Sequence, residues 1–537
     1  MSQPPAQPLE GLDPLIQGLL RPEAYDHPVS ALELLETHIS WVILTGDFAY
    51  KIKKPVNFGF VDFTTIEKRH HFCDEELRLN RRQTRDLYLA VKPIFASNGQ
   101  PSFVGTGSPI DYAVQMRQFS QSDLLPAVLA RGELRGEHLD RLAINIARFQ
   151  AAIPSAAPDS EYGSGPVIRK AMDANLATLD NAPQVKDSVD ALRDWTAQEF
   201  LRCEPEFARR RAAKKIREGH GDLHLGNMIL RHGEIEVFDC IEFNPEFRWI
   251  DLISDVAFLV MDLVDRGAAT SGWRFLNAWL SETGDYSGLG VWAWYFTYRA
   301  LVRAKVAVLR GRQADVTAAE SLHLERQMIE YVDLARRTAF RPQPTVIVTH
   351  GLSGSGKSFW AQRIASACGA VWIRSDVERK RLFAEQHQTG EQPSPALYSR
   401  ETTLRTYRHL VDLAGQVLAS GWPVLVDATC LARWQRDLFR DLSQSLGVNA
   451  LLLSFTADPA TLRERIRTRR ETGGDPSDAT EAVLANQLNH LEPVSADEGW
   501  NTLVIDANRP PEEPALLASI TSWQSSPDRF RNRPTTD

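Results

Sequence analysis

The sequence predicts an α+β region built from two lobes, followed by an α/β region with a five-stranded parallel sheet. In the first region, short segments rich in β-branched and aromatic residues precede long helical patterns, which is typical of separate sheet and helix layers. In the second region, apolar strand segments alternate with helical stretches, so a right-handed, doubly wound sheet is expected. A glycine-rich motif at 351–358 stands where the first of these strands meets its helix.

The domain boundaries follow shifts in composition. Proline-rich stretches near both ends and at Arg-Pro-Gln-Pro are typical of loose or connecting segments. The predicted order is a loosely ordered segment over 1–30 with a short helix at 14–20, a first domain over 31–340 (small lobe about 31–118, large lobe about 119–340), a linker at 341–344, a second domain over 345–510, and a partly disordered tail over 511–537.

Composition narrows the functional class. The 537 residues are 43% hydrophobic and 24% charged, which is ordinary for globular proteins. The net charge of −8 argues against a general nucleic-acid or membrane-surface binder. The five cysteines include no C-x-x-C pair, which fits a reducing cytoplasm and offers no zinc site. No apolar run reaches the roughly 18 residues of a membrane span, and the start lacks a signal-peptide pattern. We therefore expect a cytoplasmic protein.

Two β-rich segments at 40–44 and 48–53 predict a hairpin. Because alternate residues of a strand share a face, Ala49 and Lys51 point the same way. This Ala-x-Lys pattern matches the nucleotide strand of kinases, where the small residue makes room for adenine and the lysine reaches the phosphates. Lys53 shares the face and remains an alternative, and a charged edge strand would explain either lysine.

A capping-box pattern at 64–67 predicts a helix that runs to Arg82. A kinase needs an acid on this helix to hold the strand lysine. Glu76 is the first choice and Glu75 the alternative, although both also fit solvated helix charges. Further strands at 91–95 and 112–117 complete a small antiparallel lobe, and helical patterns begin near Ser120.

The sequence His-Gly-Asp-Leu-His at 220–224 continues to Asn227, and a strand-like segment ends at Asp239. In phosphotransferases of the protein-kinase kind, these offsets place a base beside the acceptor hydroxyl and two oxygen ligands on Mg²⁺. Asp222 is then the candidate base, and Asn227 and Asp239 are the candidate metal ligands. A polar turn between two strands is the plainer interpretation.

The motif at 220–227 closely resembles the catalytic loop of the aminoglycoside phosphotransferase family, which also contains choline, homoserine and fructosamine kinases. The resemblance implies a two-lobed protein-kinase-like domain that uses ATP and Mg²⁺, with Asp222 as base and Asn227 and Asp239 on the metal. His220 would brace the loop, and Asp251 and Asp255 would be structural rather than catalytic. Together with 41–55, 60–63 and 76–82, the motif also resembles bacterial proteins that join such a domain to a P-loop kinase domain.

The second domain opens with an apolar strand at 345–349 and the complete motif G-x-x-x-x-G-K-[ST]. Backbone N–H groups of such a loop surround phosphates at a helix N-terminus, Lys357 neutralises β/γ charge, and Ser358 binds Mg²⁺. The candidate nucleotide-binding residues are Gly351, Ser353, Gly354, Ser355, Gly356, Lys357 and Ser358.

Parallel strands are predicted at 371–373, 424–426, 451–455 and 503–505, and ligands bind at the carboxyl ends of such strands. Asp376 is there a candidate base, Arg379 a candidate acceptor-binding residue, and Asp427 a candidate support for Mg²⁺ through water. Helix capping would also explain either acid.

An arginine-dense helix at 462–470 resembles the lid of nucleoside-monophosphate and small-molecule kinases, so Arg465 and Arg470 are candidate phosphate contacts. The strand-Asp-x-x-Arg and strand-Asp-Ala-Thr patterns resemble the branch with polynucleotide 5′-kinase, zeta toxin and chloramphenicol phosphotransferase.

The sequence thus predicts an ATP-dependent phosphotransferase with two nucleotide sites, acting on hydroxyls of small-molecule acceptors. One alternative is a nucleotide-binding regulatory protein in which one or both sites are catalytically silent. Another is a 5′-end nucleic-acid kinase, which the acidic net charge disfavours.

Overall fold

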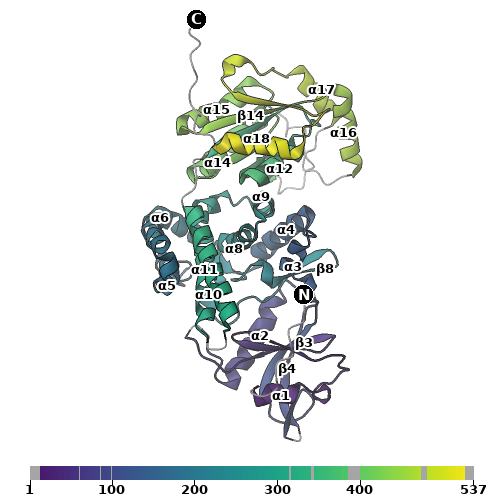
Figure 1. Ribbon diagram of the computed structural model, residues 1–537. Coiled ribbons are helices and arrows are strands. Elements are labelled where there is room, and N and C mark those ends of the chain that lie inside the picture. The colour runs from purple at the N-terminus through teal and green to yellow at the C-terminus, as the bar shows by residue number, and fades with distance from the viewer. Residues whose placement is uncertain are drawn as a thin grey trace. The chain divides into compact units, whose positions relative to one another are not determined.

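The computed structural model describes residues 12–59, 61–84, 86–97, 99–313, 316–339, 344–384, 400–472 and 480–525. The chain forms two compact units, each built from segments that are separated in the sequence (Figure 1). The first unit contains the chain up to residue 138 together with 148–163 and 211–255, and the second contains 139–147, 164–210 and everything from 256 onward.

A six-stranded antiparallel sheet of order β1-β2-β3-β6-β4-β5 organises the first unit. Its strands are β1 (Glu33–Glu36), β2 (Ser40–Leu44), β3 (Phe48–Lys53), β4 (Tyr88–Ser97), β5 (Gln100–Ser102) and β6 (Asp111–Arg117). The predicted hairpin is confirmed, since Leu44 faces Ala49 across the turn. Because β3 pairs with β2 on one side and with β6 on the other, Lys51 lies on an interior strand.

Helix α2 (Ile66–Asn80) begins where the capping pattern predicted. The Thr65 side chain accepts a hydrogen bond from the backbone N–H of Lys68, which satisfies one of the free donors of the first turn. Glu76 and Cys73 lie on the buried side of this helix.

The short helix predicted at 14–20 in the N-terminal segment is confirmed. Helix α1 (Pro14–Leu19) contributes Ile16 and Leu19, both without exposed surface, to a core that also contains Tyr25 and Tyr50. Burial of these apolar side chains outweighs the loop-forming tendency of the prolines.

Two small antiparallel pairs flank the motif at 220–227. Strand β7 (Ile216–Glu218) pairs with β10 (Trp249–Asp251), and β8 (Met228–Arg231) pairs with β9 (Glu234–Val237). The motif at 220–227 runs between β7 and β8, and Asp239 follows the end of β9.

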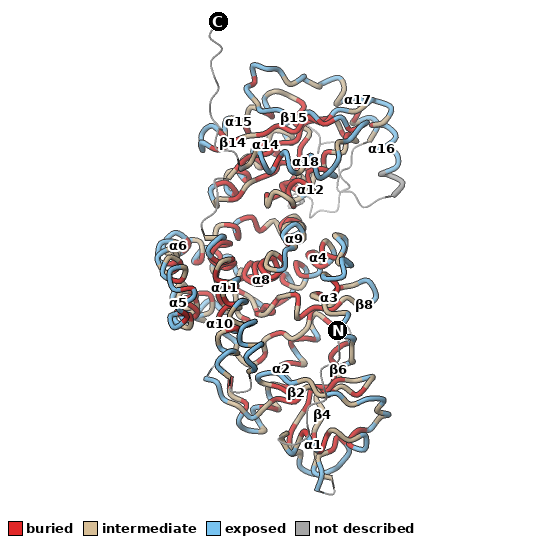
Figure 2. Tube along the Cα trace, in the orientation of Figure 1, coloured by how far each residue is buried: buried red, intermediate tan, exposed pale blue. Residues whose placement is uncertain are grey.

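Helices make up the first part of the second unit. They are α5 (Gly165–Leu179), α6 (Lys186–Ala212), α8 (Leu252–Asp265), α9 (Ala269–Thr283), α10 (Trp292–Gly311) and α11 (Ala318–Ala339), of which α6 and α8 extend across a unit boundary. Figure 2 shows buried residues along α8, whose residues 256–261 have no exposed surface.

The predicted five-stranded parallel sheet is confirmed, with strand order β12-β13-β11-β14-β15. Its strands are β11 (Thr345–His350), β12 (Val371–Arg374), β13 (Val424–Asp427), β14 (Asn449–Thr456) and β15 (Asn501–Asp506). The helices around it are α12 (Lys357–Cys368), α13 (Ser375–Ala384), α14 (Arg400–Ala419), α15 (Arg433–Leu446), α16 (Pro459–Thr472), α17 (Glu481–Asn489) and α18 (Glu513–Ser525). Every residue of the central strand β11 is buried.

The expected disorder of the tail from residue 511 does not hold for its described part. Residues 513–525 form α18, and Leu516 and Ile520 pack into the core beneath the sheet. These apolar residues, with Leu517 and Trp523, recur at helical spacing, so one face of the helix is buried despite the prolines before it.

Within the described parts of the chain, no helix is long and apolar enough to cross a membrane.

We expect Leu516→Ala and Ile520→Ala each to lower the free energy of unfolding by about 2–5 kcal/mol, because each leaves a cavity against the sheet. Chemical denaturation followed by native-state hydrogen exchange in β11 would measure the loss. Ser519→Ala, at an exposed position of the same helix, should stay within about 0.5 kcal/mol. Equal stability of all three variants would show that α18 is not part of the core.

Candidate active sites

The first unit brings three predicted residues into direct contact. Lys51 Nζ lies 2.8 Å from Glu76 Oε1 and 2.5 Å from Asp239 Oδ1. The alternative acid, Glu75, instead pairs with Arg78 and Arg248. Strand β3, helix α2 and the segment after β9 therefore converge on one charged centre.

The second lysine of β3 lies deeper in the same centre. The Lys53 side chain has no exposed surface, its Nζ lies 2.7 Å from Glu76 Oε2, and it donates a further hydrogen bond to Glu242. Burial alone would lower the pKa of Lys53, but the Glu242 and Glu76 carboxylates outweigh it and raise that pKa above its ordinary value. Lys51, at 13% exposed, is the more accessible of the two lysines.

Glu76 is shared between both lysines. Burial by itself would raise its pKa, but the charges of Lys51 and Lys53 prevail and hold the pKa at about 2. Burial raises the pKa of Glu242, the second carboxyl beside Lys53. We did not predict a role for Glu242 from the sequence. The available signal was an acid three residues beyond Asp239.

A carboxylate from the start of α8 holds the loop that carries Asp222. Asp255 accepts hydrogen bonds from the backbone N–H groups of His220 at 2.7 Å and Gly221 at 2.9 Å. Gly221 has φ +86°, and a Cβ there would come within 2.5 Å of the Phe247 carbonyl oxygen, so only glycine fits. The loop conformation therefore depends on Asp255 and on this glycine.

The predicted base and one predicted metal ligand touch. Asn227 Nδ2 donates to Asp222 Oδ2 at 2.9 Å and to the Asp222 carbonyl at 3.0 Å, while His224 Nε2 lies 3.2 Å from the same carboxylate oxygen. Since the amide nitrogen of Asn227 is committed to Asp222, its Oδ1 is the atom that would bind a metal.

Asp239 has an uncommon backbone. Its φ is +61°, a left-handed conformation that is costly for a residue other than glycine. Its N–H donates to the Tyr88 hydroxyl at 3.2 Å. The Asp239 and Asp222 side chains are 41% and 34% exposed, so these two carboxylates, unlike Glu76, are open to a ligand.

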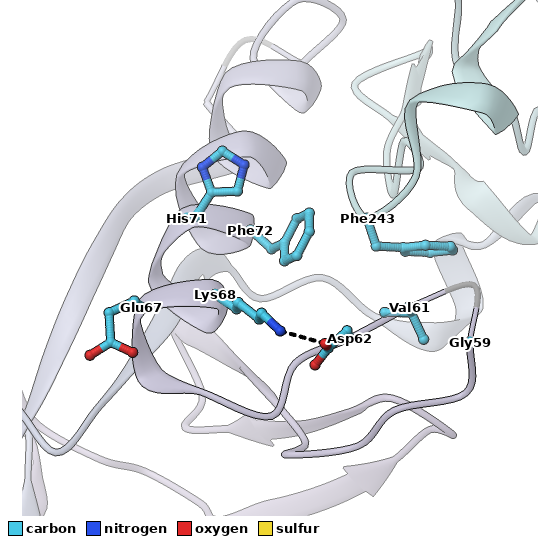
Figure 3. Close-up of a pocket in the computed structure, with 8 residues that line it drawn as sticks. All are labelled: Gly59, Val61, Asp62, Glu67, Lys68, His71, Phe72 and Phe243. Carbon is cyan, nitrogen blue, oxygen red and sulfur yellow. Dashed lines mark hydrogen bonds and ion pairs between the residues drawn. The ribbon is translucent and has the colours of Figure 1, made fainter.

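A pocket of about 460 Å³ lies in the same unit (Figure 3). Figure 3 shows the rings of Phe72 and Phe243 on either side of it, and Lys68 paired with Asp62 at its floor. Phe243 directly follows Glu242 in the chain. The lining residues are Gly59, Val61, Asp62, Glu67, Lys68, His71, Phe72 and Phe243, and none of them was a predicted site residue.

In the second unit, the glycine-rich loop joins β11 to α12 and has the backbone of an anion cradle. Gly351, Gly354 and Gly356 have φ of +138°, +85° and +84°. A Cβ on Gly351 would meet the Phe455 carbonyl oxygen at 2.5 Å. Lys357 Nζ donates to the Leu352 carbonyl at 2.8 Å, inside the loop.

Polar atoms of this loop fit a phosphate group. Among the described residues, the buried Ser355 Oγ has no hydrogen-bond partner. Its hydroxyl could therefore donate a hydrogen bond to a bound phosphate, because buried polar groups are normally hydrogen-bonded. Gln487 of α17 bonds both the backbone N–H and the hydroxyl of Ser353, at 2.9 Å and 3.0 Å. Sequence reasoning missed Gln487, because a lone glutamine far along the chain gives no signal.

The predicted acids of the second site lie at adjacent strand ends. Asp427 ends β13, where it pairs in register with Arg374 of β12, and Asp376 follows two residues later in the first turn of α13. Burial raises the pKa of Asp427, although Arg374 and a hydrogen bond from the Ser358 hydroxyl oppose this. The Ser358 hydroxyl and the Asp427 carboxyl thus lie side by side. This placement is what the predicted Mg²⁺ site requires, with Ser358 binding the ion directly and Asp427 binding it through a water molecule.

The remaining predictions for the second site divide. Arg379 lies 3.2 Å from Asp376, and Arg465 donates to the backbone carbonyls of Gly354 at 3.4 Å and Ala507 at 2.9 Å. The Arg470 side chain lies outside the described residues. Within the described chain there is no group of three or more His, Cys, Asp or Glu side chains poised around one metal. Asn and Ser oxygens would have to complete either Mg²⁺ site.

We expect Glu76→Gln to lower the free energy of unfolding by about 3–5 kcal/mol above pH 4.5, because Lys53 is left with one buried partner instead of two. The folded pKa of about 2 lies below the ordinary 4.5, so the contribution of Glu76 is present above pH 4.5 and fades as the pH falls toward 2. Urea denaturation over that pH range should show the difference from wild type shrinking, with Glu75→Gln as the milder matched control. A difference independent of pH would mean that Glu76 is not an ionised bridge.

A family model described as an AAA domain matches residues 346–494. Among solved structures, the amicoumacin kinase hAmiN in complex with AMP-PNP, Ca²⁺ and Ami is 14% identical, with 59% of this chain and 92% of that chain covered and a TM-score of 0.38. A sugar kinase from Janibacter sp. HTCC2649 is 22% identical, with 34% of this chain and 94% of that chain covered and a TM-score of 0.26.

Similarity to two mycobacterial proteins runs through most of the chain. The uncharacterized proteins Rv2004c of Mycobacterium tuberculosis and Mb2027c of Mycobacterium bovis are each 31% identical over 468 residues, which cover 86% of this chain and 90% of the relative. This chain has its AAA family match within the region that forms the parallel sheet. It belongs to the family of these mycobacterial proteins.

Proposed function

We propose that the chain is a phosphotransferase with two nucleotide sites, each transferring the γ-phosphoryl group of ATP to a hydroxyl of a small-molecule acceptor. The observation that carries the proposal is the ion-paired centre in which Lys51 contacts both Glu76 and Asp239. Such a centre aligns the α/β-phosphates with the metal-binding carboxylate, and phosphoryl transfer depends chiefly on this kind of positioning.

In the first site, Lys51 binds the α/β-phosphates and Glu76 fixes its direction. The acceptor hydroxyl lies against Asp222, whose carboxylate takes its proton as the hydroxyl oxygen bonds to the γ-phosphorus. The bond from that phosphorus to the bridging oxygen breaks, and ADP leaves with the electron pair. Asn227 and Asp239 would hold Mg²⁺, which would supply neutralisation of the phosphate charge.

In the second site, the backbone N–H groups of residues 351–356 and the Lys357 amine bind the phosphates. Asp376 takes the acceptor proton, and Arg379, beside it at 3.2 Å, holds an anionic group of the acceptor. Arg465, on α16 beside the loop, binds the phosphates, and Arg470, whose side chain lies outside the described residues, is the second candidate for this role. Ser358 would hold Mg²⁺ directly and Asp427 through water.

Two nucleotides per chain are expected from this proposal. Calorimetric titration with a non-hydrolysable ATP analogue should give a stoichiometry of about two for wild type and about one for Lys51→Met or Lys357→Ala, because each variant loses the amine that neutralises phosphate charge at one site. Arg440→Ala, which removes a cation far along α15, should bind like wild type. A single site that only one of the two lysines affects would refute the two-site proposal.

Transfer of labelled γ-phosphate into a small-metabolite extract would separate the two reactions. We expect Asp222→Asn and Asp376→Asn to abolish different labelled products, with each rate falling about 10²–10⁴-fold because a general base is lost. Asp441→Asn, at a carboxylate that is 65% exposed, should leave both product sets unchanged.

Bound nucleotide without any labelled product would instead favour a regulatory protein that binds ATP without turnover. Label on added 5′-hydroxyl oligonucleotides, with binding that weakens steeply as salt rises, would favour the nucleic-acid kinase.

A further inference from the structure

The edge strand β12 of the parallel sheet is joined to a helix outside the P-loop fold. Asn277 of α9, which is buried, donates from Nδ2 to the Ala370 carbonyl at 3.0 Å and accepts at Oδ1 from the Trp372 N–H at 2.8 Å. A side-chain amide carries N–H donors and a carbonyl acceptor side by side, so it can bond a strand backbone as a neighbouring strand would. All of these residues belong to the second compact unit.

The helix that follows β12, α13, is also bonded to α9 and to the segment that follows α9. Glu378 of α13 is 1% exposed and accepts a hydrogen bond from the Tyr286 hydroxyl at 3.0 Å. Tyr286 begins the short helix η5 (Tyr286–Val291). Arg381 also binds Glu378, and its other nitrogen donates to the Ser281 carbonyl of α9 at 2.5 Å. Helix α13 is therefore tied to α9 and to η5.

Glu378 stays ionised in this buried position. Burial would raise its pKa, but hydrogen bonds with His409 and Arg381 outweigh burial and lower it. His409 Nε2 of α14 lies 3.4 Å from the second carboxylate oxygen. Because a buried carboxylate depends on every one of its partners, loss of the Tyr286 hydroxyl must shift the helix or leave the charge poorly satisfied.

An apolar seam accompanies these polar contacts. The rings of Trp273 and Trp422 lie 5.1 Å apart, and Trp292 contacts Trp422 edge-on at 6.4 Å. Gly369 ends α12 with φ +63°, and a Cβ there would lie 3.2 Å from the Trp273 ring. Helix α9 thus lies against α12 with no room for a larger residue (Figure 1).

Resting on the proposed function of the P-loop site, we propose that Asn277 and Tyr286 are positioning residues for phosphoryl transfer at that site. Asp376 lies between the two tethers, four residues after Trp372 and two residues before Glu378. The tethers fix the junction between β12 and α13, and with it the base and Arg379. Displacement of a reacting group by about 1 Å can cost about 10²-fold in rate.

The glycine-rich loop does not share this dependence. It follows the central strand β11, and the hydrogen bonds found for its backbone among the described residues come from the turn after β13, from α16 and α17 and from the loop's own end at Lys357. When the tethers are weakened, the rate of transfer at the second site should therefore fall while the nucleotide affinity of that site stays nearly unchanged.

Tyr286→Phe in the full chain tests the proposal, because it removes one hydroxyl and keeps the ring. We expect kcat of Asp376-dependent transfer to fall about tenfold or more, while the ATP dissociation constant at the second site changes less than about twofold and Asp222-dependent transfer is unchanged. Tyr331→Phe is the matched control: it also removes a buried hydroxyl of this unit, one that contacts Arg303 instead of α13.

Hydrogen exchange supplies a readout that does not require activity. In Tyr286→Phe and Asn277→Ala, amides of α13 should exchange faster than in wild type, while those of β14 and β15 keep their rates. If the wild-type chain shows no Asp376-dependent transfer, the proposed function of the second site is wrong. The exchange rates of α13 would then still show whether Asn277 and Tyr286 hold this helix in place.

Two results would overturn the inference. One is unchanged kcat together with unchanged α13 exchange in both variants. The other is faster exchange throughout the sheet with parallel losses of ATP affinity and kcat, because that pattern reports general destabilisation rather than misplacement of α13.

Discussion

The first site depends on one buried carboxylate shared by two lysines. Glu76 meets Lys51 through one oxygen and Lys53 through the other, at 2.8 Å and 2.7 Å. Separation of β3 from α2 would break both of these buried ion pairs at once, so the two elements cannot part without a large cost in free energy. Glu242 and Asp239 extend the same network to the segment after β9. Ion pairing, rather than apolar packing alone, holds β3 against the segment after β9.

In the second candidate site, backbone hydrogen bonds rather than ion pairs hold the glycine-rich loop in place. The Thr349 hydroxyl donates to the Ala428 carbonyl at 2.7 Å, and the Gly351 N–H donates to the Thr429 carbonyl at 3.0 Å. The glycine-rich loop is thereby joined to the turn that follows Asp427. Backbone donors at a helix N-terminus need no counter-charge to stay in place, which explains why this site contains fewer buried ion pairs than the first.

Neither the ion-paired centre nor the glycine-rich loop identifies the acceptor of the proposed reactions. Protein-kinase-like and P-loop frameworks each support many reactions, because the groups that bind ATP are separate from those that bind the hydroxyl compound. In this chain, the Asp222 and Asp239 side chains are partly exposed while Glu76 and Lys53 are buried. Specificity for an acceptor at the first site would therefore depend on the residues around Asp222 and Asp239.

The sequence by itself determined the fold class, the parallel sheet and the identity of most candidate residues, because glycine-rich loops, strand alternation and the spacing of Asp222, Asn227 and Asp239 are local patterns. Only the tertiary structure decided which strand lysine is the more accessible, that Glu242 joins Lys53, and that Gln487 reaches Ser353. It also turned the proline-rich end into the packed helix α18. These facts depend on contacts between residues far apart in the chain, and no local pattern records such contacts.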